Sequence, residues 1–122
     1  MSPSPEVFER DGLVLEVHRW GREVSVTWRG ISDARDPSAF AGQVLRDLGN
    51  QPDVDSIELD FRKLEFMNSA TLTPIMALIR TLDSKGVRAI LRFDAMIDWQ
   101  RINYNCMKAI ARTLSSLRVE GQ

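Results

Sequence analysis

Cysteine and histidine are nearly absent from the sequence, which has one of each among its 122 residues. The single cysteine, Cys106, excludes an internal disulfide and any metal site built from several cysteines, and it suits a reducing cytoplasm. The seven glycines never cluster, so the sequence has no Gly-rich phosphate-binding loop. No uninterrupted apolar run is long enough to cross a bilayer. We therefore expect a cytoplasmic protein with no membrane span, no bound metal and no other cofactor.

An excess of either charge is also lacking. Sixteen Lys and Arg residues stand against 17 Asp and Glu residues, so the formal net charge of -1 offers no field that would attract nucleic acid or an anionic membrane. Residues 1–10 lack the basic and apolar parts of a secretory signal. We expect a disordered lead over residues 1–10 and a single domain over residues 11–122, a length at which roughly two-thirds of the unfolded surface becomes buried.

Apolar residues alternate with polar residues in four short segments, which predicts strands, and recur at helical spacing in three longer segments. Strands that alternate with helices require crossovers and a mixed sheet. Each helix has one apolar stripe, so the helices should pack mainly on one face of that sheet. The fold class is therefore α/β with four strands, or five as the alternative. The expected strands cover residues 13–17, 24–28, 57–61 and 87–93, and the expected helices cover residues 38–48, 72–82 and 99–114.

Few residues suggest catalysis. His18 falls on the polar side of the first predicted strand, beside Glu16, and no nucleophile motif stands near it, so we interpret it as a surface residue. Three acidic residues lie near strand ends without an obvious partner, namely Asp60, Glu65 and Asp94. An enzyme needs titratable groups that converge in a pocket. We therefore expect no catalytic residue and no enzymatic activity.

The last predicted helix has an apolar stripe on which the single cysteine falls. We expect Cys106 to be a small buried side chain rather than a reactive thiol. The start of the helix is also apolar, and Met96 and Trp99 there form a candidate docking patch. The stripe consists of Trp99, Ile102, Cys106, Ile110 and Leu114.

A polar cluster at residues 68–71 separates the apolar end of a strand from the apolar stripe of the next helix. Free backbone N–H groups and the helix dipole at such a junction favour an anion, including a phosphate on Ser69. A plainer interpretation is that Ser69 only caps the helix, because Ser and Asn are common caps. In a third interpretation Pro74 makes the helix begin late, with Thr73 as its cap and Ser69 on an exposed turn.

The segment Leu64–Leu72, after the strand Ile57–Asp60, resembles the phosphorylation segment of STAS domains of the anti-sigma factor antagonist type. That pattern has an apolar strand with an Asp, a short apolar link, and then Asp-Ser-Ser/Ala-Gly-Leu at the opening of a helix. Gly30 and Gly86 also fall where the family often has glycine. The resemblance covers nearly the whole chain and implies a STAS-like fold for residues 11–122.

The resemblance also implies a phosphorylation switch. Ser69 would be phosphorylated by a partner kinase and dephosphorylated by a phosphatase. The unphosphorylated form would bind the kinase, as an anti-sigma factor, or another target, and phosphorylation would break that contact. Two residues depart from the family pattern, because Asn68 replaces Asp and Thr71 replaces Gly. The implied partner-binding residues are Met67, Asn68, Ser69, Ala70, Thr71 and Thr73.

The junction is also similar to that of phosphoprotein regulators that control a diguanylate cyclase in bacterial biofilm signalling. Their segment reads Leu-Asn-Thr-Ser-Ser-Ile with a threonine as the phosphoacceptor, and residues 67–72 fit that spacing with the Asn retained. Thr71, close to Ser69, is the alternative phosphoacceptor. The stretch Leu91–Asp94 resembles the last strand of that group. We therefore expect a non-enzymatic bacterial regulatory module, a monomer or weak homodimer, that switches between protein partners. A constitutive scaffold of the same fold, not regulated at Ser69, is the alternative.

Overall fold

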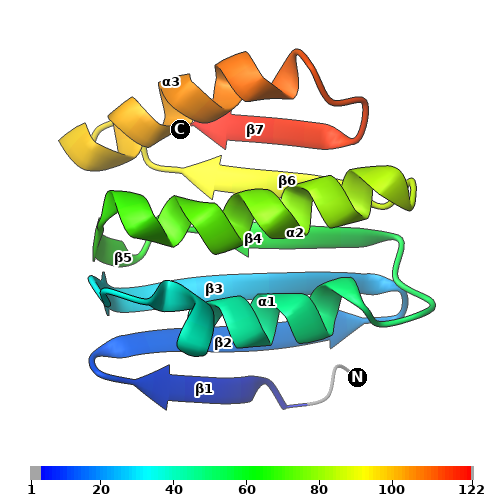
Figure 1. The fold of residues 1–122 in the computed structure, drawn as a ribbon, viewed down its shortest axis with the longest axis horizontal. Coiled ribbons are helices and arrows are strands. Elements are labelled where there is room, and N and C mark those ends of the chain that lie inside the picture. The colour runs from blue at the N-terminus through cyan, green and yellow to red at the C-terminus, as the bar shows by residue number, and fades with distance from the viewer. Residues whose placement is uncertain (1–3, 122) are drawn as a thin grey trace.

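The computed structural model of the protein describes residues 4–121. Over this range the chain forms one sheet, three α-helices and two short 3₁₀ helices (Figure 1). The strands are β1 (Glu6–Arg10), β2 (Leu13–Trp20), β3 (Glu23–Ser32), β4 (Ser56–Asp60), β5 (Leu64–Met67), β6 (Arg88–Phe93) and β7 (Leu117–Gly121). The helices are α1 (Ala41–Gly49), α2 (Leu72–Ser84) and α3 (Asp98–Ala111), and the 3₁₀ helices are η1 (Pro37–Ala39) and η2 (Ser69–Thr71).

The sheet is mixed, as the sequence predicts. Its strand order is β1-β2-β3-β4-β6-β7, with antiparallel pairs from β1 to β3 and parallel pairs from β3 to β7. The short strand β5 pairs in parallel with the last residues of β3, beyond the point where β4 ends. Each helix lies in a crossover between parallel strands, which is how a chain connects them. This arrangement confirms the expected α/β class with a mixed sheet.

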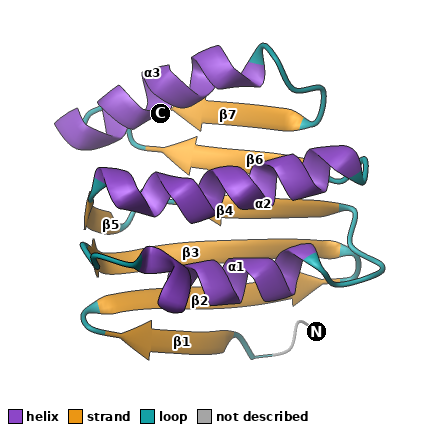
Figure 2. Ribbon diagram, in the orientation of Figure 1, coloured by secondary structure: helices purple, strands orange, loops and turns teal. Residues whose placement is uncertain are grey.

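The helices lie mainly on one side of the sheet. Helices α1 and α2 cover its near face and α3 packs along β7 at one edge (Figure 2). The strands alternate buried and half-exposed side chains, because successive residues point to opposite faces. Three aromatic rings form the centre of the core, with the Trp28 and Phe61 centroids 5.1 Å apart and the Phe61 and Phe93 centroids 5.0 Å apart.

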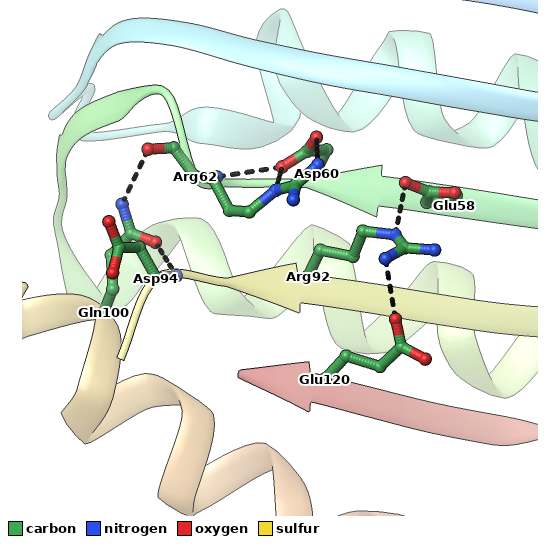
Figure 3. Close-up of polar contacts among 7 residues, drawn as sticks. All are labelled: Glu58, Asp60, Arg62, Arg92, Asp94, Gln100 and Glu120. Carbon is green, nitrogen blue, oxygen red and sulfur yellow. Dashed lines mark hydrogen bonds and ion pairs between the residues drawn. The ribbon is translucent and has the colours of Figure 1, made fainter. Parts of the chain in front are cut away.

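The opposite face of the sheet carries ion pairs that cross from strand to strand. Arg92 on β6 lies between Glu58 of β4, at 2.7 Å, and Glu120 of β7, at 2.8 Å (Figure 3). Arg29 on β3 pairs with Glu16 on β2 at 2.7 Å. Opposite charges on neighbouring strands stabilise their register, since a slip by one residue would move each charge to the other face.

The strand count and the lead differ from expectation. The sheet has seven strands rather than four or five, and residues 6–10, expected to be disordered, form the edge strand β1. Asp11 and Gly12 connect β1 to β2 with φ values of 51° and 86°, so the chain reverses tightly into an antiparallel pair. That pairing orders a segment whose own sequence is not strongly apolar. Residues 1–3 of the expected lead lie outside the described residues.

The buried face of α3 also differs from expectation. Gln100 and Met107 are its fully buried side chains, whereas Ile102 is 67% exposed and Cys106 is exposed. The expected buried environment of Cys106 is therefore wrong. Three residues of the expected stripe do pack against the core, namely Trp99, Ile110 and Leu114. The most deeply buried positions nevertheless belong to Met107 and to Gln100, whose amide satisfies backbone groups.

Gly30 fixes the geometry at the end of β3. Its φ is 80°, and a Cβ there would lie 2.0 Å from the carbonyl oxygen of Gly12, so only glycine fits. The next residue, Ile31, donates its N–H to that same Gly12 carbonyl at 3.1 Å. The register of β3 shifts between these two residues, and β5 pairs with β3 at this point.

Candidate functional site

The junction between β5 and α2 is built around Asn68. Its backbone is extended, with φ -77° and ψ 165°, and its side-chain oxygen accepts the N–H of Thr71 at 3.1 Å. This is the cap that the N-terminus of the short helix η2 requires. Helix α2 follows directly and begins at Leu72, so the predicted late start with Thr73 as the cap is wrong. Pro74 is accommodated because it lies in the first turn of α2, where its missing N–H has no partner to lose.

The Asn68 side chain also connects the junction to the segment after β3. Its amide nitrogen donates to the carbonyl of Ala34 at 3.1 Å, and its backbone N–H donates to the carbonyl of Ser32 at 2.9 Å. Asn68 thus contacts two segments with donors and an acceptor at once. A carboxylate could cap η2 but has no hydrogen to donate to Ala34.

A buried pair of hydroxyl groups lies beneath the junction. Thr71 is 0% exposed and its hydroxyl lies 2.8 Å from that of Ser32, which is 3% exposed. The Thr71 hydroxyl also donates to the side-chain oxygen of Asn68 at 2.7 Å. Buried hydroxyl groups are costly without such partners. The threonine that replaces the family's glycine is therefore a structural residue, and the fold encloses its oxygen.

The predicted partner-binding residues divide by exposure. Ser69 and Thr73 are exposed, and Asn68 and Ala70 are partly exposed. Met67 and Thr71 are buried and belong to the core beneath them. Within residues 4–121, the Ser69 hydroxyl has no side-chain hydrogen bond, unlike the hydroxyl of Thr71. On the turn at residues 68–71, Ser69 therefore presents a hydroxyl group without a side-chain hydrogen bond, while Asn68 and Thr71 are held by hydrogen bonds.

An apolar surface adjoins this turn. Phe66, next to the junction on β5, is 45% exposed, and its strand partner Ile31 is 40% exposed. The Trp99 ring lies 6.5 Å from the Phe66 ring in an edge-on arrangement, and its indole N–H donates to the carbonyl of Glu65 at 2.8 Å. We call the two rings of Phe66 and Trp99, together with the adjoining aliphatic side chain of Ile31, the aromatic patch. The sequence marked Trp99 as a docking candidate, whereas nothing in it marked Ile31.

The start of α3 is held to β5 and to the loop before it by Gln100, a residue that no sequence pattern marked. Gln100 is 0% exposed, accepts the Asp94 N–H at 2.7 Å and donates to the carbonyl of Leu64 at 3.2 Å and, at 3.5 Å, to that of Arg62 (Figure 3). A glutamine on a helix gives no local signal of burial. The bonds hold Trp99, the residue before it, against β5.

A hollow of about 190 Å³ lies beside the segment that Asn68 contacts. Its lining is mostly apolar but includes three carboxylates and one guanidinium, from Asp11, Asp33, Asp36 and Arg10. The hollow is next to Ala34, to which the Asn68 amide is bonded. The surface around the junction is thus recessed and acidic on the side of η1.

The acidic residues considered for catalysis do not converge on a common site. Burial of the Asp60 carboxyl opposes its ionisation, but hydrogen bonds from the side chain and backbone N–H of Arg62 outweigh that cost and lower the pKa of Asp60. Asp94 accepts the N–H of Met96 at 2.9 Å and so forms its own turn, and Glu65 is exposed. The carboxylates of Asp60 and Asp94 therefore have structural contacts, and that of Glu65 faces the solvent.

The single histidine lies away from these carboxylates, on β2. The His18 ring stacks on the exposed ring of Trp20, with centroids 5.5 Å apart and nearly parallel planes. Its Nε2 atom lies 3.6 Å from a carboxylate oxygen of Glu16, the residue beside which the sequence placed it.

Residues 4–121 contain no group of three or more His, Cys, Asp or Glu side chains placed to hold a metal ion. Within the same range, none of the helices has both the length and the apolar character needed to cross a bilayer.

In comparisons of sequence, no protein-family model matches this chain and no curated protein matches it significantly. The fold has solved counterparts. An anti-sigma factor antagonist from Mycobacterium paratuberculosis superposes with a TM-score of 0.59 at 15% sequence identity, over 94% of this chain and 84% of that chain. The anti-sigma factor antagonist SpoIIAA in its unphosphorylated form superposes with a TM-score of 0.55 at 20% identity, over 64% of this chain and 71% of that chain. The protein therefore has the fold of the anti-sigma factor antagonists.

Proposed function

We propose that this protein is a regulatory module that binds a protein partner through the β5–α2 junction and is switched by phosphorylation of Ser69. The observation that carries the proposal is the Ser69 hydroxyl, which is exposed and free of side-chain hydrogen bonds while the residues on both sides of it are fixed. A kinase needs an accessible hydroxyl group, and a switch needs that group at a surface of defined shape.

The aromatic patch supplies the contact area beside this switch. Exposed aromatic side chains with defined positions are favoured anchors at protein interfaces. Phe66 is two residues before Asn68, so a partner that covers the patch also reaches Ser69. A phosphate there adds about -1.5 to -2 charges and must be desolvated when the interface closes, which opposes binding.

The buried hydroxyl of Thr71 argues for Ser69 as the acceptor. Phosphorylation at Thr71 would require its 0% exposed side chain to leave the hydrogen bonds with Ser32 and Asn68. This favours Ser69 under either resemblance, because the threonine acceptor of the diguanylate cyclase regulators also aligns with Ser69. Following the resemblance to anti-sigma factor antagonists, we propose a kinase that doubles as an anti-sigma factor as the first partner, and a phosphatase as the second.

The same features support a binding role rather than an enzymatic one. Asp60 is engaged by Arg62, and the carboxylates of Asp94 and Glu65 serve a turn and the solvent, respectively. A protein that exchanges between a kinase and a phosphatase belongs in the cytoplasm, where ATP and reducing conditions are found. The exposed thiol of Cys106 is compatible with that compartment.

Affinity enrichment from the native host tests the proposal. Ser69→Ala and Ser69→Asp variants serve as baits, and Ser84→Asp, which adds the same charge at the far end of α2, is the control. We expect at least one protein that is retained by Ser69→Ala and by Ser84→Asp and depleted at least tenfold with Ser69→Asp. Quantitative mass spectrometry gives the ratios.

Equal retention of every partner by the three baits would support the constitutive scaffold and reject the switch. Retention that depends on Ser84 as strongly as on Ser69 would show a general response to charge. Circular dichroism of each bait establishes that the variants are folded before the comparison is made.

A further inference from the structure

In the described part of the chain, one edge of the sheet is a strand, β1, that is unpaired on its outer side. β1 pairs with β2 on one side, and in Figure 1 it is the outermost strand, with neither α1 nor α2 covering it. The backbone N–H and C=O groups on the outer side of an edge strand are available to pair with another strand. Val7 near the middle of β1 is 57% exposed, so the edge also offers an apolar side chain.

The charges along β1 are complementary to those of a second copy of β1. By their register with β2, the side chains of Glu6, Phe8 and Arg10 share one face of the sheet. If two β1 strands pair in antiparallel fashion about Phe8, Glu6 of each copy lies opposite Arg10 of the other. Opposite charges directly across an antiparallel pair stabilise it, and so does an aromatic pair. We propose that the protein forms a symmetric homodimer in which two β1 strands join the two sheets into one.

The charges also favour this register, in which all five residues of β1 are paired, over neighbouring ones. A shift by one residue in one direction places Glu6 opposite Glu9 of the other copy, and a shift by two in the other direction places Glu9 opposite itself. A parallel pair in register would set each charge against its own kind. The register centred on Phe8 is the antiparallel one in which both Glu6 and Arg10 face a charge of opposite sign. An interface of this kind is closed and two-fold, as in most soluble homo-oligomers.

The ion pairs at the two edges of the sheet support a second copy of this chain as the partner of β1. Among residues 4–121, the Arg10 guanidinium has no ion-pair partner, and Glu6 is paired with Arg19 at 3.0 Å on an exposed surface. At the other edge of the sheet, Arg118 on β7 is already paired with Glu120 at 2.7 Å. Of the two edges, β1 is therefore the one whose guanidinium is still available for a neighbouring molecule.

The dimer leaves the proposed binding surface open. β5 and η2 lie at the end of β3 and do not pair with β1, so both copies can present Ser69 to a partner. Two strands of five residues bury an area at the low end of specific interfaces, so we expect a weak, concentration-dependent dimer.

Charge reversal tests the pairing and its register. Glu6→Arg sets two guanidinium groups opposite each other across the two-fold axis, and Arg10→Glu sets two carboxylates opposite each other. Each variant alone should raise the dimer dissociation constant at least tenfold in sedimentation equilibrium. An equimolar mixture of the two variants restores opposite charges at every position and should recover association, as a heterodimer. Circular dichroism checks that each variant is folded, because Glu6→Arg also removes the pair with Arg19.

A wild-type chain that stays monomeric at high protein concentration overturns the proposal and leaves the edge open to a strand of a different protein. Two variants that each associate as well as the wild type also overturn it. A mixture that associates no better than either variant alone rejects the register centred on Phe8.

Disulfide trapping gives a second measurement that does not depend on charge. In a Cys106→Ser background, which removes the exposed native thiol, Phe8→Cys places two thiols directly opposite at the two-fold axis. Val7→Cys is the matched control, since residue 7 lies opposite residue 9 in this register. We expect covalent dimer to form at least tenfold faster with Phe8→Cys, and equal rates would contradict the proposed pairing.

Discussion

At the residue scale, the Asn68 amide joins two segments that are 34 residues apart in the chain, because it donates to Ala34 while it caps η2. An aspartate at this position could accept the two hydrogen bonds from Thr71, but its second oxygen would face the Ala34 carbonyl oxygen. The contact with the segment after β3 thus explains why Asn stands here in place of the Asp of the anti-sigma factor antagonist pattern. Asn68 has an amide N–H donor where an Asp would have a negatively charged oxygen.

We predict that Asn68→Asp lowers the free energy of unfolding by about 1–2 kcal/mol, because it leaves the Ala34 carbonyl opposite an oxygen, while the helix dipole offsets part of that cost. Urea denaturation measures the difference. Asn105→Asp, on an exposed position of α3, is the matched control and should change the value by less than about 0.5 kcal/mol. Equal effects of the two changes would show that the Asn68 amide does not fix the junction.

Asp60 predicts how stability depends on pH. Its pKa is lowered in the fold because hydrogen bonds from Arg62 outweigh the cost of burial, so its contribution is present above the pKa of an unfolded Asp, about 3.9, and is lost as the pH falls through the lower folded value. We expect the free energy of unfolding of Asp60→Asn to be about 2 kcal/mol lower than that of the wild type near pH 7. This difference should narrow below about pH 3. Urea denaturation of both proteins across this pH range measures the difference. A difference that does not change with pH would contradict the claim that the ionised carboxylate of Asp60 stabilises the fold.

The sequence located the exposed serine but not the contacts that fix its surroundings. Ser69 follows an apolar strand and precedes an amphipathic helix, which is a local pattern. The bonds from Asn68 to Ala34 and from Thr71 to Ser32 join residues 34 and 39 positions apart, and no local pattern encodes them. Thr71 could therefore be proposed as an acceptor from the sequence although the fold encloses its hydroxyl group.

At the scale of elements, the position of α3 depends on one buried amide. Gln100 bonds to Asp94 before the helix and to Leu64 on β5, and it precedes Met107 by two turns on the buried face. The helix thereby places Trp99 against Phe66. The aromatic patch exists because a strand and a helix from distant parts of the chain are fastened at this point.

We predict that Gln100→Leu lowers the free energy of unfolding by about 2–3 kcal/mol, because a side chain of similar size leaves the Asp94 N–H and the Leu64 carbonyl buried without partners. Asn105→Leu, on the exposed side of the same helix, is the control. Urea denaturation of both variants gives the comparison. A loss below about 0.5 kcal/mol for Gln100→Leu would mean that α3 is held in place by its apolar contacts alone.

The central elements were predictable and those at the edges were not. Strands β2, β3, β4 and β6 have clear alternation or apolar character, because one of their faces is buried by helices. The edge strands β1 and β7 and the short β5 bury little and depend on pairing with a neighbour. The stripe of α3 was predicted only in part, because Trp99, Ile110 and Leu114 pack against the core while a buried glutamine and an exposed isoleucine reverse the usual preference.

At the scale of the whole molecule, one face of the sheet is covered by helices and the other carries paired charges. The junction, the aromatic patch and the acidic hollow all lie around the end of β3, where β5 pairs and α2 begins. The β1 edge is two strands from β3 in the strand order, and its last residue, Arg10, also lines the hollow. The proposed second copy and the proposed partner thus use different parts of the sheet: the outer side of β1 for the second copy, and the end of β3 with β5 for the partner.

Mapping of phosphate on the protein tests the central claim most directly. The protein is purified from its native host, or incubated with host extract and ATP, and its phosphorylated residues are located by mass spectrometry beside a Ser69→Ala variant. Phosphate on Ser69 in the wild type, with none gained elsewhere in the variant, is the predicted result. Phosphate on Thr71 or another residue while Ser69 stays unmodified would contradict the account.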